Sequence, residues 1–250
     1  MLTLLNLHLS EPLYPGKFGL ELRQLLQKYS SKSQKTLGYQ RAREEIYSYV
    51  YNDPTDQAVY CVYSGSRMPC MYNSMDTGCN ADLNCEHTVP QSFFNKQDPM
   101  VSDIHHLRTA WSKANNGRQN YPFKRLNGTS GTFFGPNFTQ TTKQPPQIEN
   151  WSVLDKGKFM PRQVQMGDTA RAIAYFYTRY PTEAGNITKV INVDEMIEWD
   201  QEFEPTDLQY QQYLRAVEVQ KNRNPYYEEK GLVARAYCDI STKFPCSQYQ

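Results

Sequence analysis

Several features that often reveal a protein's class are weak or missing in this sequence. The 27 Lys and Arg residues nearly balance the 26 Asp and Glu residues, so the formal net charge is only +1. No overall electric field would therefore hold the protein on a polyanion, and any affinity for nucleic acid must come from a local basic patch. Hydrophobic content is ordinary at 39%, which is typical of a soluble globular chain and argues against disorder or membrane spanning.

The sequence also contains no internal repeat, low-complexity segment or convincing linker. At 250 residues it is long enough to bury a proper core, and we expect one domain covering residues 1–250. The opening residues, MLTLLNLHLS, have a short apolar run but neither a basic start nor a clear small-residue cleavage site. They therefore make a poor signal peptide.

The cysteines form a cluster of four and a close C-terminal pair. An even number is compatible with three disulfides, so we expect all of them to be bridged in a secreted or periplasmic protein. A zinc site is the weaker interpretation because no Cys-x-x-Cys pair occurs. The cysteines are Cys61, Cys70, Cys79, Cys85, Cys238 and Cys246.

Sequons of the form Asn-x-Ser/Thr give weak additional support for secretion. They permit glycosylation, although such short patterns also arise by chance. They begin at Asn127, Asn137, Asn150 and Asn186.

Hydrophobic spacing predicts a mixture of helices and short strands. Residues 19–32, 36–52 and 167–180 have helical spacing, whereas 58–64 and 104–107 are typical of strands. We expect another helix to begin at Thr109 and to end near Asn116-Gly117, because Asn-Gly is a common helix stop. Residues 126–150 predict a hairpin with loops. The run 194–207 carries seven acids and no base, which indicates a solvated face.

A local basic cluster lies in residues 101–125. The segment contains five basic residues against one acid, which is the excess that a phosphate-binding cleft needs in a nearly neutral chain. Three aromatic residues are interleaved with it and either stack nucleic-acid bases or belong to the core. The basic residues are Arg108, Lys113, Arg118, Lys124 and Arg125, and the aromatic ones are Trp111, Tyr121 and Phe123.

A carboxylate and a histidine stand side by side at Glu86 and His87. Hydrolysis of a phosphodiester requires an activated water, which an imidazole can supply, and stabilised charge on the phosphate and leaving oxygen, which a divalent cation can supply. Mg²⁺ takes oxygen ligands, and an acid with an amide is sufficient when waters complete the shell. Adjacent side chains on an extended strand point to opposite sides, so Glu86 and His87 could hold the metal and the base in different directions.

Four blocks of this sequence resemble successive blocks of a nuclease family. In order they are NCEHTVPQSFF, DIHHLRTAWSKANNGRQNYPF, KFMPRQVQMGDTARAIAYFYTRY and NRNPYY. They resemble the endonuclease I family of the ββα-metal (His-Me finger) class over roughly residues 40–227, followed by a tail over 228–250 that holds a Cys pair. The resemblance implies an α+β, mainly helical single domain around a ββα-metal core, with disulfide reinforcement.

The resemblance also implies roles for particular residues. His87 matches the general base, Glu86 and Asn115 match the metal ligands, and Arg108 and Arg118 match basic positions that could bind a phosphate. The implied cofactor is Mg²⁺, with Ca²⁺ or Mn²⁺ possible. If the helix runs through residue 118, Asn115 and Arg118 share one face; if Gly117 ends it, that geometry fails.

The remaining histidines of the block have supporting roles at most. We expect one of His105 and His106 to orient the site through a hydrogen bond and the other simply to pack. The sequence departs from the family at Thr109, where Pro is frequent, and in the cysteine cluster and the tail, which leaves substrate preference open.

The resulting hypothesis is a largely nonspecific endonuclease that cleaves DNA, RNA or both into products with 5′ phosphates. It needs no membrane and no obligate protein partner. One alternative is a secreted zinc-binding or nucleic-acid-binding module without catalysis, with His105, His106 and Cys85 as ligands. Another is a disulfide-stabilised structural or inhibitor protein.

Overall fold

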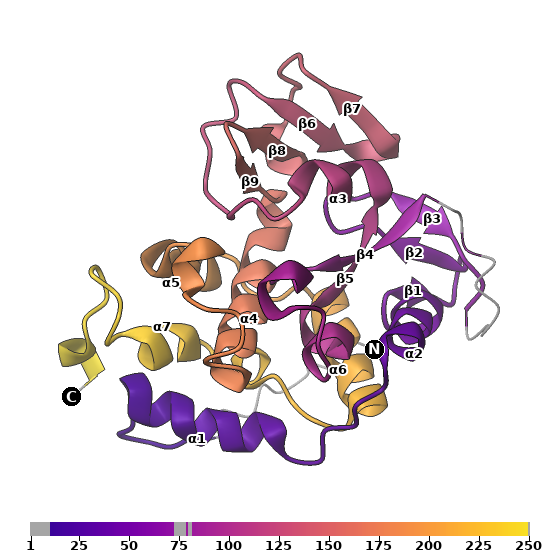
Figure 1. Cartoon of the computed structure of the whole chain (residues 1–250). Helices are drawn as coiled ribbons and strands as arrows, with labels where there is room; N and C mark the ends of the chain where they lie inside the picture. Colours follow the sequence, from indigo (N-terminus) through magenta and orange to yellow (C-terminus); the bar gives the residue numbers. More distant parts are fainter. Residues whose placement is uncertain (1–10, 73–78, 80–81, 250) are drawn as a thin grey trace, which may run out of the picture.

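The computed structural model describes residues 11–72, 79 and 82–249. The opening residues, which the sequence predicts to be a poor signal peptide, lie outside this part of the chain. Within it, helices are combined with three small sheets, so the predicted α+β class is confirmed. Figure 1 shows a four-stranded sheet at one end of the molecule, α1 at the other end, and a two-stranded sheet between them.

The elements are short apart from a few helices. The helices are α1 (Gly19–Ser31), α2 (Tyr39–Glu45) with a π-helical turn (Ile46–Val50), α3 (Ser112–Arg118), α4 (Gln163–Arg179), α5 (Val193–Glu202), α6 (Asp207–Gln220) and α7 (Leu232–Tyr237). The strands are β1 (Asn52–Asp53), β2 (Ala58–Tyr60), β3 (Arg67–Pro69), β4 (Leu83–His87), β5 (Leu107–Trp111), β6 (Thr132–Gly135), β7 (Thr139–Thr141), β8 (Ser152–Asp155) and β9 (Lys158–Met160). The sheets have the orders β1-β2-β3, β4-β5 and β7-β6-β8-β9, with neighbouring strands antiparallel.

The predicted strand and helix around Thr109 are both displaced along the chain. Residues 104–106 form a 3₁₀ turn, the strand occupies Leu107–Trp111, and the helix begins only at Ser112. Thr109 is extended because it pairs with Cys85 across the β4–β5 ladder, and such tertiary pairing overrides local helical preference.

The Asn-Gly pair does not end this helix, which continues through Arg118. A Cβ atom on Gly117 would lie 2.5 Å from Cζ of Phe134 on β6. The glycine is therefore explained by the close approach of the four-stranded sheet to α3, not by a helix stop.

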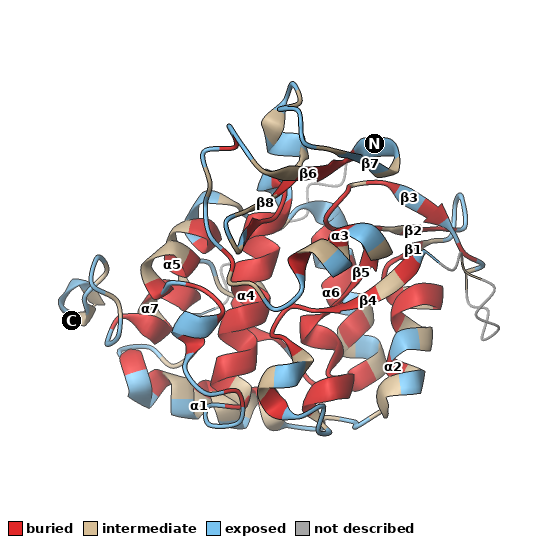
Figure 2. Ribbon diagram, turned by 45° about the horizontal axis from the view of Figure 1, so that its top comes forward, coloured by how far each residue is buried: buried red, intermediate tan, exposed pale blue. Residues whose placement is uncertain are grey.

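Helix α4 forms the centre of the protein. Every residue from Gln165 to Thr178 is buried, so the helix is covered on all sides and not only on one amphipathic face (Figure 2). The end of helix α5 packs against it at Gly167, where a Cβ atom would lie 2.0 Å from the carbonyl oxygen of Phe203, the residue after α5. Gly167 thus permits the contact between these two helices.

The acidic run 194–207 is not simply a solvated face. Asp200 is buried and pairs with Arg171 at 3.0 Å, which contradicts the prediction at this position. Asp194 accepts hydrogen bonds from the backbone and side chains of residues 241–243. The acids therefore attach α5 to α4 and to the C-terminal loop.

Two disulfides are present, Cys70–Cys79 and Cys238–Cys246, and they are compatible with an oxidising compartment. The prediction that all the cysteines are bridged is wrong for Cys61 and Cys85, which are buried free thiols. Strand β5 separates them. Thr109 pairs with Cys85 on one side and, on the other, bonds to Tyr60 and Val62, the neighbours of Cys61. Two strand spacings amount to about 10 Å, which is too far for a disulfide.

One contiguous hydrophobic cluster connects the sheets with the helices, from Leu22 on α1 to Tyr237 on α7. Among the helices of the described residues, none is long and apolar enough to cross a bilayer.

Candidate active site

Strands β4 and β5 and helix α3 follow one another around a loop of 3₁₀ turns and form a ββα unit. In the antiparallel ladder, Glu86 lies opposite Arg108 and His87 lies opposite Leu107. Helix α3 follows β5 directly and contacts both strands. This unit carries Glu86, His87 and Asn115 on adjoining elements.

The Glu86 carboxylate is buried, with 3% of the residue exposed. Its Oε1 accepts a hydrogen bond of 2.7 Å from the hydroxyl of Tyr63 and lies 3.3 Å from Nη1 of Arg118. Burial raises the pKa of Glu86, while the Arg118 charge and the Tyr63 hydrogen bond oppose this shift. A cation close to this carboxylate would stabilise its charged form further.

The imidazole of His87 is also turned into the protein, with 5% of the residue exposed. Its Nε2 lies 3.0 Å from the carbonyl oxygen of Val101. A carbonyl can only accept, so Nε2 carries the proton and Nδ1 keeps the lone pair. Burial lowers the pKa of His87 to about 3, and the neighbouring charges of His106 and Arg118 act in the same direction. The ring is therefore neutral near pH 7, and its Nδ1 carries a lone pair.

Aromatic rings surround His87 on its face of β4. Tyr39 of α2 and His106 have ring centroids 5.4 and 5.5 Å away, and Phe94 lies at 6.3 Å. Glu86 instead contacts Tyr63 and Arg118, as expected when adjacent residues of a strand point to opposite faces.

Asn115 is half-buried on α3 and reaches the backbone of β4. Its Nδ2 donates a hydrogen bond of 3.4 Å to the carbonyl of Cys85, the residue before Glu86. This bond uses the nitrogen of the amide and leaves Oδ1 for another partner. Because the helix runs through Arg118, Asn115 and Arg118 do share the face that meets β4.

Arg118 is buried beneath the same strand, with 1% of the residue exposed. Besides the ion pair with Glu86, it donates to the carbonyls of His87, Thr88 and Gln119 at 3.3, 2.8 and 3.0 Å. Its donors thus fix the chain at the end of β4.

Arg108 is buried as well and is paired with Asp168 of α4. Nε and Nη2 of the guanidinium lie 2.6 and 3.1 Å from the two carboxylate oxygens, and Nη1 donates to the carbonyls of His105 and Leu107. This arrangement joins β5 to α4 and leaves Arg108 and Asp168 on the wall of a small cavity of about 20 Å³.

His105 and His106 lie on different sides of the chain. His106 packs edge-to-face on His87, and its Nε2 lies 2.7 Å from the carbonyl of Met100. The Nε2 of His105 lies 3.1 Å from the carbonyl of Asn222, and its ring packs on Tyr175. His106 therefore supports the His87 ring by contact, whereas His105 belongs to the helical core.

The oxygen atoms that Glu86 and Asn115 offer are of the kind that Mg²⁺ prefers. In the described part of the chain, no three His, Cys, Asp or Glu side chains gather in a way that could hold a metal ion. The alternative zinc site formed by Cys85, His105 and His106 is therefore not found. A carboxylate and an amide oxygen, both of them hard ligands, match the small protein contribution that Mg²⁺ needs.

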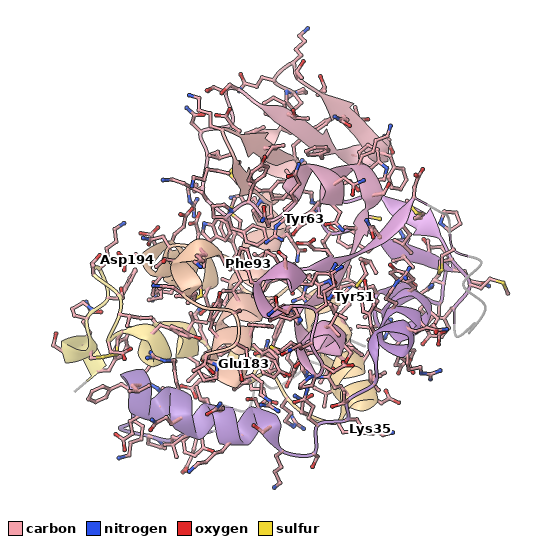
Figure 3. All side chains as sticks on the ribbon, viewed as in Figure 1. Lys35, Tyr51, Tyr63, Phe93, Glu183 and Asp194 are labelled. Carbon is pink, nitrogen blue, oxygen red and sulfur yellow. A yellow bond between two sulfur atoms is a disulfide. The ribbon has the colours of Figure 1, made fainter. Side chains whose placement is uncertain are left out.

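The sequence gives little indication of two residues that organise this region. Tyr63, labelled in Figure 3, lies in a loop between β2 and β3, and no motif marks it. Its hydroxyl contacts Glu86. Asp168 stands in the apolar helix α4, where a lone acid among core residues is the only available signal. Both form contacts with residues far away in the sequence.

The basic cluster of residues 101–125 does not form one cleft. Arg108 and Arg118 are buried, and Arg125 pairs with Glu202 at 2.5 Å. Of the aromatic residues proposed for base stacking, Trp111 and Phe123 belong to the buried core. Lys113 remains exposed at the start of α3.

The chain matches the family described as Endonuclease I over residues 17–231. The match begins before the predicted limit near residue 40, so it includes α1 as well as the ββα unit. This family implies a hydrolytic nuclease, and hence nucleic acid as the substrate. Since the matched region covers most of the 250 residues, the chain belongs to the Endonuclease I family.

Proposed function

We propose that this protein is a metal-dependent endonuclease that hydrolyses internal phosphodiester bonds of DNA, RNA or both with little sequence preference. The observation that carries this proposal is the neutral His87, held by Val101, directly beside a buried carboxylate on the same strand. The absence of any recognised groove-reading element in the sequence supports low sequence preference.

In this proposal Nδ1 of His87 takes a proton from the attacking water. The carbonyl of Val101 holds the opposite ring nitrogen and so fixes the orientation of the base. A pKa of about 3 makes the free ring a weak base, but the negative charge of a bound phosphate would raise this pKa. The proton would then pass to the ring as the water oxygen attacks phosphorus.

Glu86 and Asn115 would hold one divalent cation, with Mg²⁺ the expected ion and Ca²⁺ or Mn²⁺ as substitutes. When bound, the ion would supply positive charge to the scissile phosphate and the departing 3′ oxygen. Departure of that oxygen would leave the phosphate on the 5′ side of the next nucleotide.

Arg118 and Arg108 are better suited to positioning than to direct contact with substrate. Arg118 holds Glu86 and the end of β4, and Arg108 holds β5 on α4. Binding of a phosphate by either guanidinium would require breaking these buried bonds, at a high cost. We therefore assign both a positioning role.

Purified protein incubated with plasmid DNA and with RNA, each with Mg²⁺ and with excess chelator, tests the activity directly. We expect cleavage only with the metal, and products that a 5′-phosphate-dependent exonuclease can degrade. Full activity in chelator would exclude the metal assignment, and no cleavage of either polymer would exclude the proposed function.

The base is tested separately, because its ring is almost completely covered. His87→Ala should reduce kcat by about a hundredfold or more while the affinity for Mg²⁺ changes little. Diethyl pyrocarbonate should modify His87 in the native protein and inactivate it, and bound oligonucleotide should protect the ring. A native His87 that never reacts would show that Nδ1 is out of reach of water.

We further propose that the protein acts in a secreted or periplasmic setting. The two disulfides support this proposal, and so does the exposure of the four sequon asparagines, which glycosylation would require. Mass spectrometry of protein isolated from its natural source would detect the glycans.

A further inference from the structure

A groove of about 630 Å³ lies between the start of α3 and the edge strand β7, outside the cluster around Glu86 and His87. This volume is in the range of pockets that hold ligands of nucleotide size. The groove is lined by Trp111, Lys113, Phe138, Gln140, Thr141 and Thr142. Its walls therefore combine aromatic rings, hydrogen-bonding side chains and one cation.

Phe138 is held in the groove by a strained backbone. Asn137 and Phe138 have φ angles of 56° and 55°, a region that bulky residues rarely adopt. The amide of Phe138 donates a 3.1 Å hydrogen bond to Oγ of Ser66, and its half-buried ring packs edge-to-face on Trp111 at 5.7 Å. Strain of this kind tends to occur where a binding site requires a particular side-chain position.

Lys113 is the only charged residue among the described residues that line the groove. It is exposed, and its ammonium group lies 5.6 Å from the centroid of the Trp111 ring. No carboxylate of the lining competes for this charge, so the groove favours an anionic ligand. The half-buried ring of Phe138 offers a surface on which an unsaturated ring can stack.

The ladder places the groove on the same face as the candidate base. His87 lies opposite Leu107, and Trp111 is four residues further along β5, so their side chains share one face. This separation along the strand is about 13 Å, or about two nucleotides of an extended strand. A nucleic-acid strand that enters the site could therefore continue into the groove.

We propose that this groove binds a single-stranded part of the substrate about two nucleotides from the cleaved bond. A base stacks on Phe138, the adjoining phosphate pairs with Lys113, and Gln140 and Thr141 offer hydrogen bonds to the base or sugar. Stacking on an aromatic ring tolerates every base, which agrees with low sequence preference. The proposal rests on the proposed nuclease function.

Binding is tested in excess chelator, where the proposed enzyme does not cleave. Fluorescence anisotropy would follow oligothymidylate and oligouridylate probes of about eight nucleotides. Phe138→Leu keeps an apolar side chain but removes the ring, and Lys113→Gln keeps the length but removes the charge. Lys35→Ala is the matched control, because Lys35 is an exposed lysine at the end of the molecule opposite the four-stranded sheet (Figure 3).

We expect Phe138→Leu to weaken binding of both probes about fivefold or more. Lys113→Gln should weaken binding and reduce the slope of log affinity against log salt by about one. Lys35→Ala should leave both properties unchanged. Affinities of both groove variants within twofold of the unmodified protein would overturn the proposal.

A dinucleotide substrate separates this proposal from the nuclease function. It spans the cleaved bond but does not reach the groove. Phe138→Leu should therefore cleave the dinucleotide with the same kcat/KM as the unmodified protein. On the longer oligonucleotide the kcat/KM of this variant should fall. An equal loss on both substrates would show that Phe138 supports the catalytic centre and would overturn the subsite. The two groove variants could bind the probes more weakly, as predicted, although the unmodified protein cleaves no substrate. That result would support the binding groove and refute the nuclease function.

Discussion

The hydroxyl of Tyr63 donates a 2.7 Å hydrogen bond to the buried carboxylate of Glu86, which is 23 residues away in the sequence. The tyrosine lowers the pKa of Glu86 against the effect of burial, so it helps keep the carboxylate charged. This contact makes the candidate metal ligand dependent on a residue outside the ββα unit.

Tyr63→Phe should therefore raise the Mg²⁺ concentration needed for half-maximal activity by about tenfold, the usual effect of removing an outer partner of a ligand. Stability should fall by about 1 kcal/mol because one hydrogen bond is lost. Titration of activity with Mg²⁺ and unfolding in urea measure the two effects. Tyr177→Phe is the control, since that hydroxyl contacts Ala184. An unaltered Mg²⁺ requirement in Tyr63→Phe would remove Tyr63 from this role.

The pair formed by Arg108 and Asp168 should be sensitive to single substitutions. Both side chains are buried, so Arg108→Met leaves the Asp168 carboxylate without its counter-charge, although Gln165 and Tyr227 still donate hydrogen bonds to it. The variant should destabilise the protein by about 3 kcal/mol. The double variant with Asp168→Leu should lose clearly less free energy of unfolding than the sum of the losses in the two single variants. Denaturant unfolding of the four proteins measures the coupling. Strictly additive losses of unfolding free energy would mean that the ion pair makes no coupled contribution to stability.

Gly117→Ala should destabilise the protein although alanine favours helices. The added methyl would meet the Phe134 ring, and such overpacking costs about 1 to 3 kcal/mol. Phe134→Leu should recover part of this loss in the double variant, because the smaller side chain vacates the space. A more stable Gly117→Ala variant would show that the ring moves aside without cost.

Acid should loosen the C-terminal loop before it unfolds the core. Desolvation opposes ionisation of Asp194, but hydrogen bonds from residues 241–243 outweigh it and lower its pKa to about 2. A carboxyl with a lowered pKa contributes stability above its normal pKa of about 4, and the contribution is lost as pH falls from there towards 2. The protection of the Thr242 and Lys243 amides against hydrogen exchange, relative to an unfolded chain at the same pH, should fall over this range. In Asp194→Asn, whose side chain does not titrate, exchange should lack this step.

The cysteines should divide into two bridges and two thiols. Burial raises the pKa of Cys61 and Cys85 to about 12, so both should resist alkylation in the native protein. After denaturation without reductant, intact-mass analysis should find two alkyl groups, on Cys61 and Cys85. A third disulfide, or native labelling of either residue, would contradict the structure.

The sequence was sufficient to predict the α+β class and the Endonuclease I family. These follow from local patterns, namely helical periodicity and the ordered blocks around Glu86 and Asn115. The boundaries around Thr109 were misplaced, because the hydrogen bonds that hold this residue extended come from strands distant in sequence. Gly117 was misread for a related reason, since the ring that requires it belongs to β6.

Burial and partner choice were decided by the tertiary structure alone. The charge of Arg108 and Arg118 can be read from the sequence, but their commitment to Asp168, Glu86 and backbone carbonyls depends on where the folded chain brings those acceptors. The same holds for Cys61 and Cys85, which strand β5 keeps apart. A sequence determines which groups are available for chemistry. The fold determines which of these groups are desolvated and which acceptors they meet. Desolvation and partner choice both depend on contacts between segments that lie far apart along the chain.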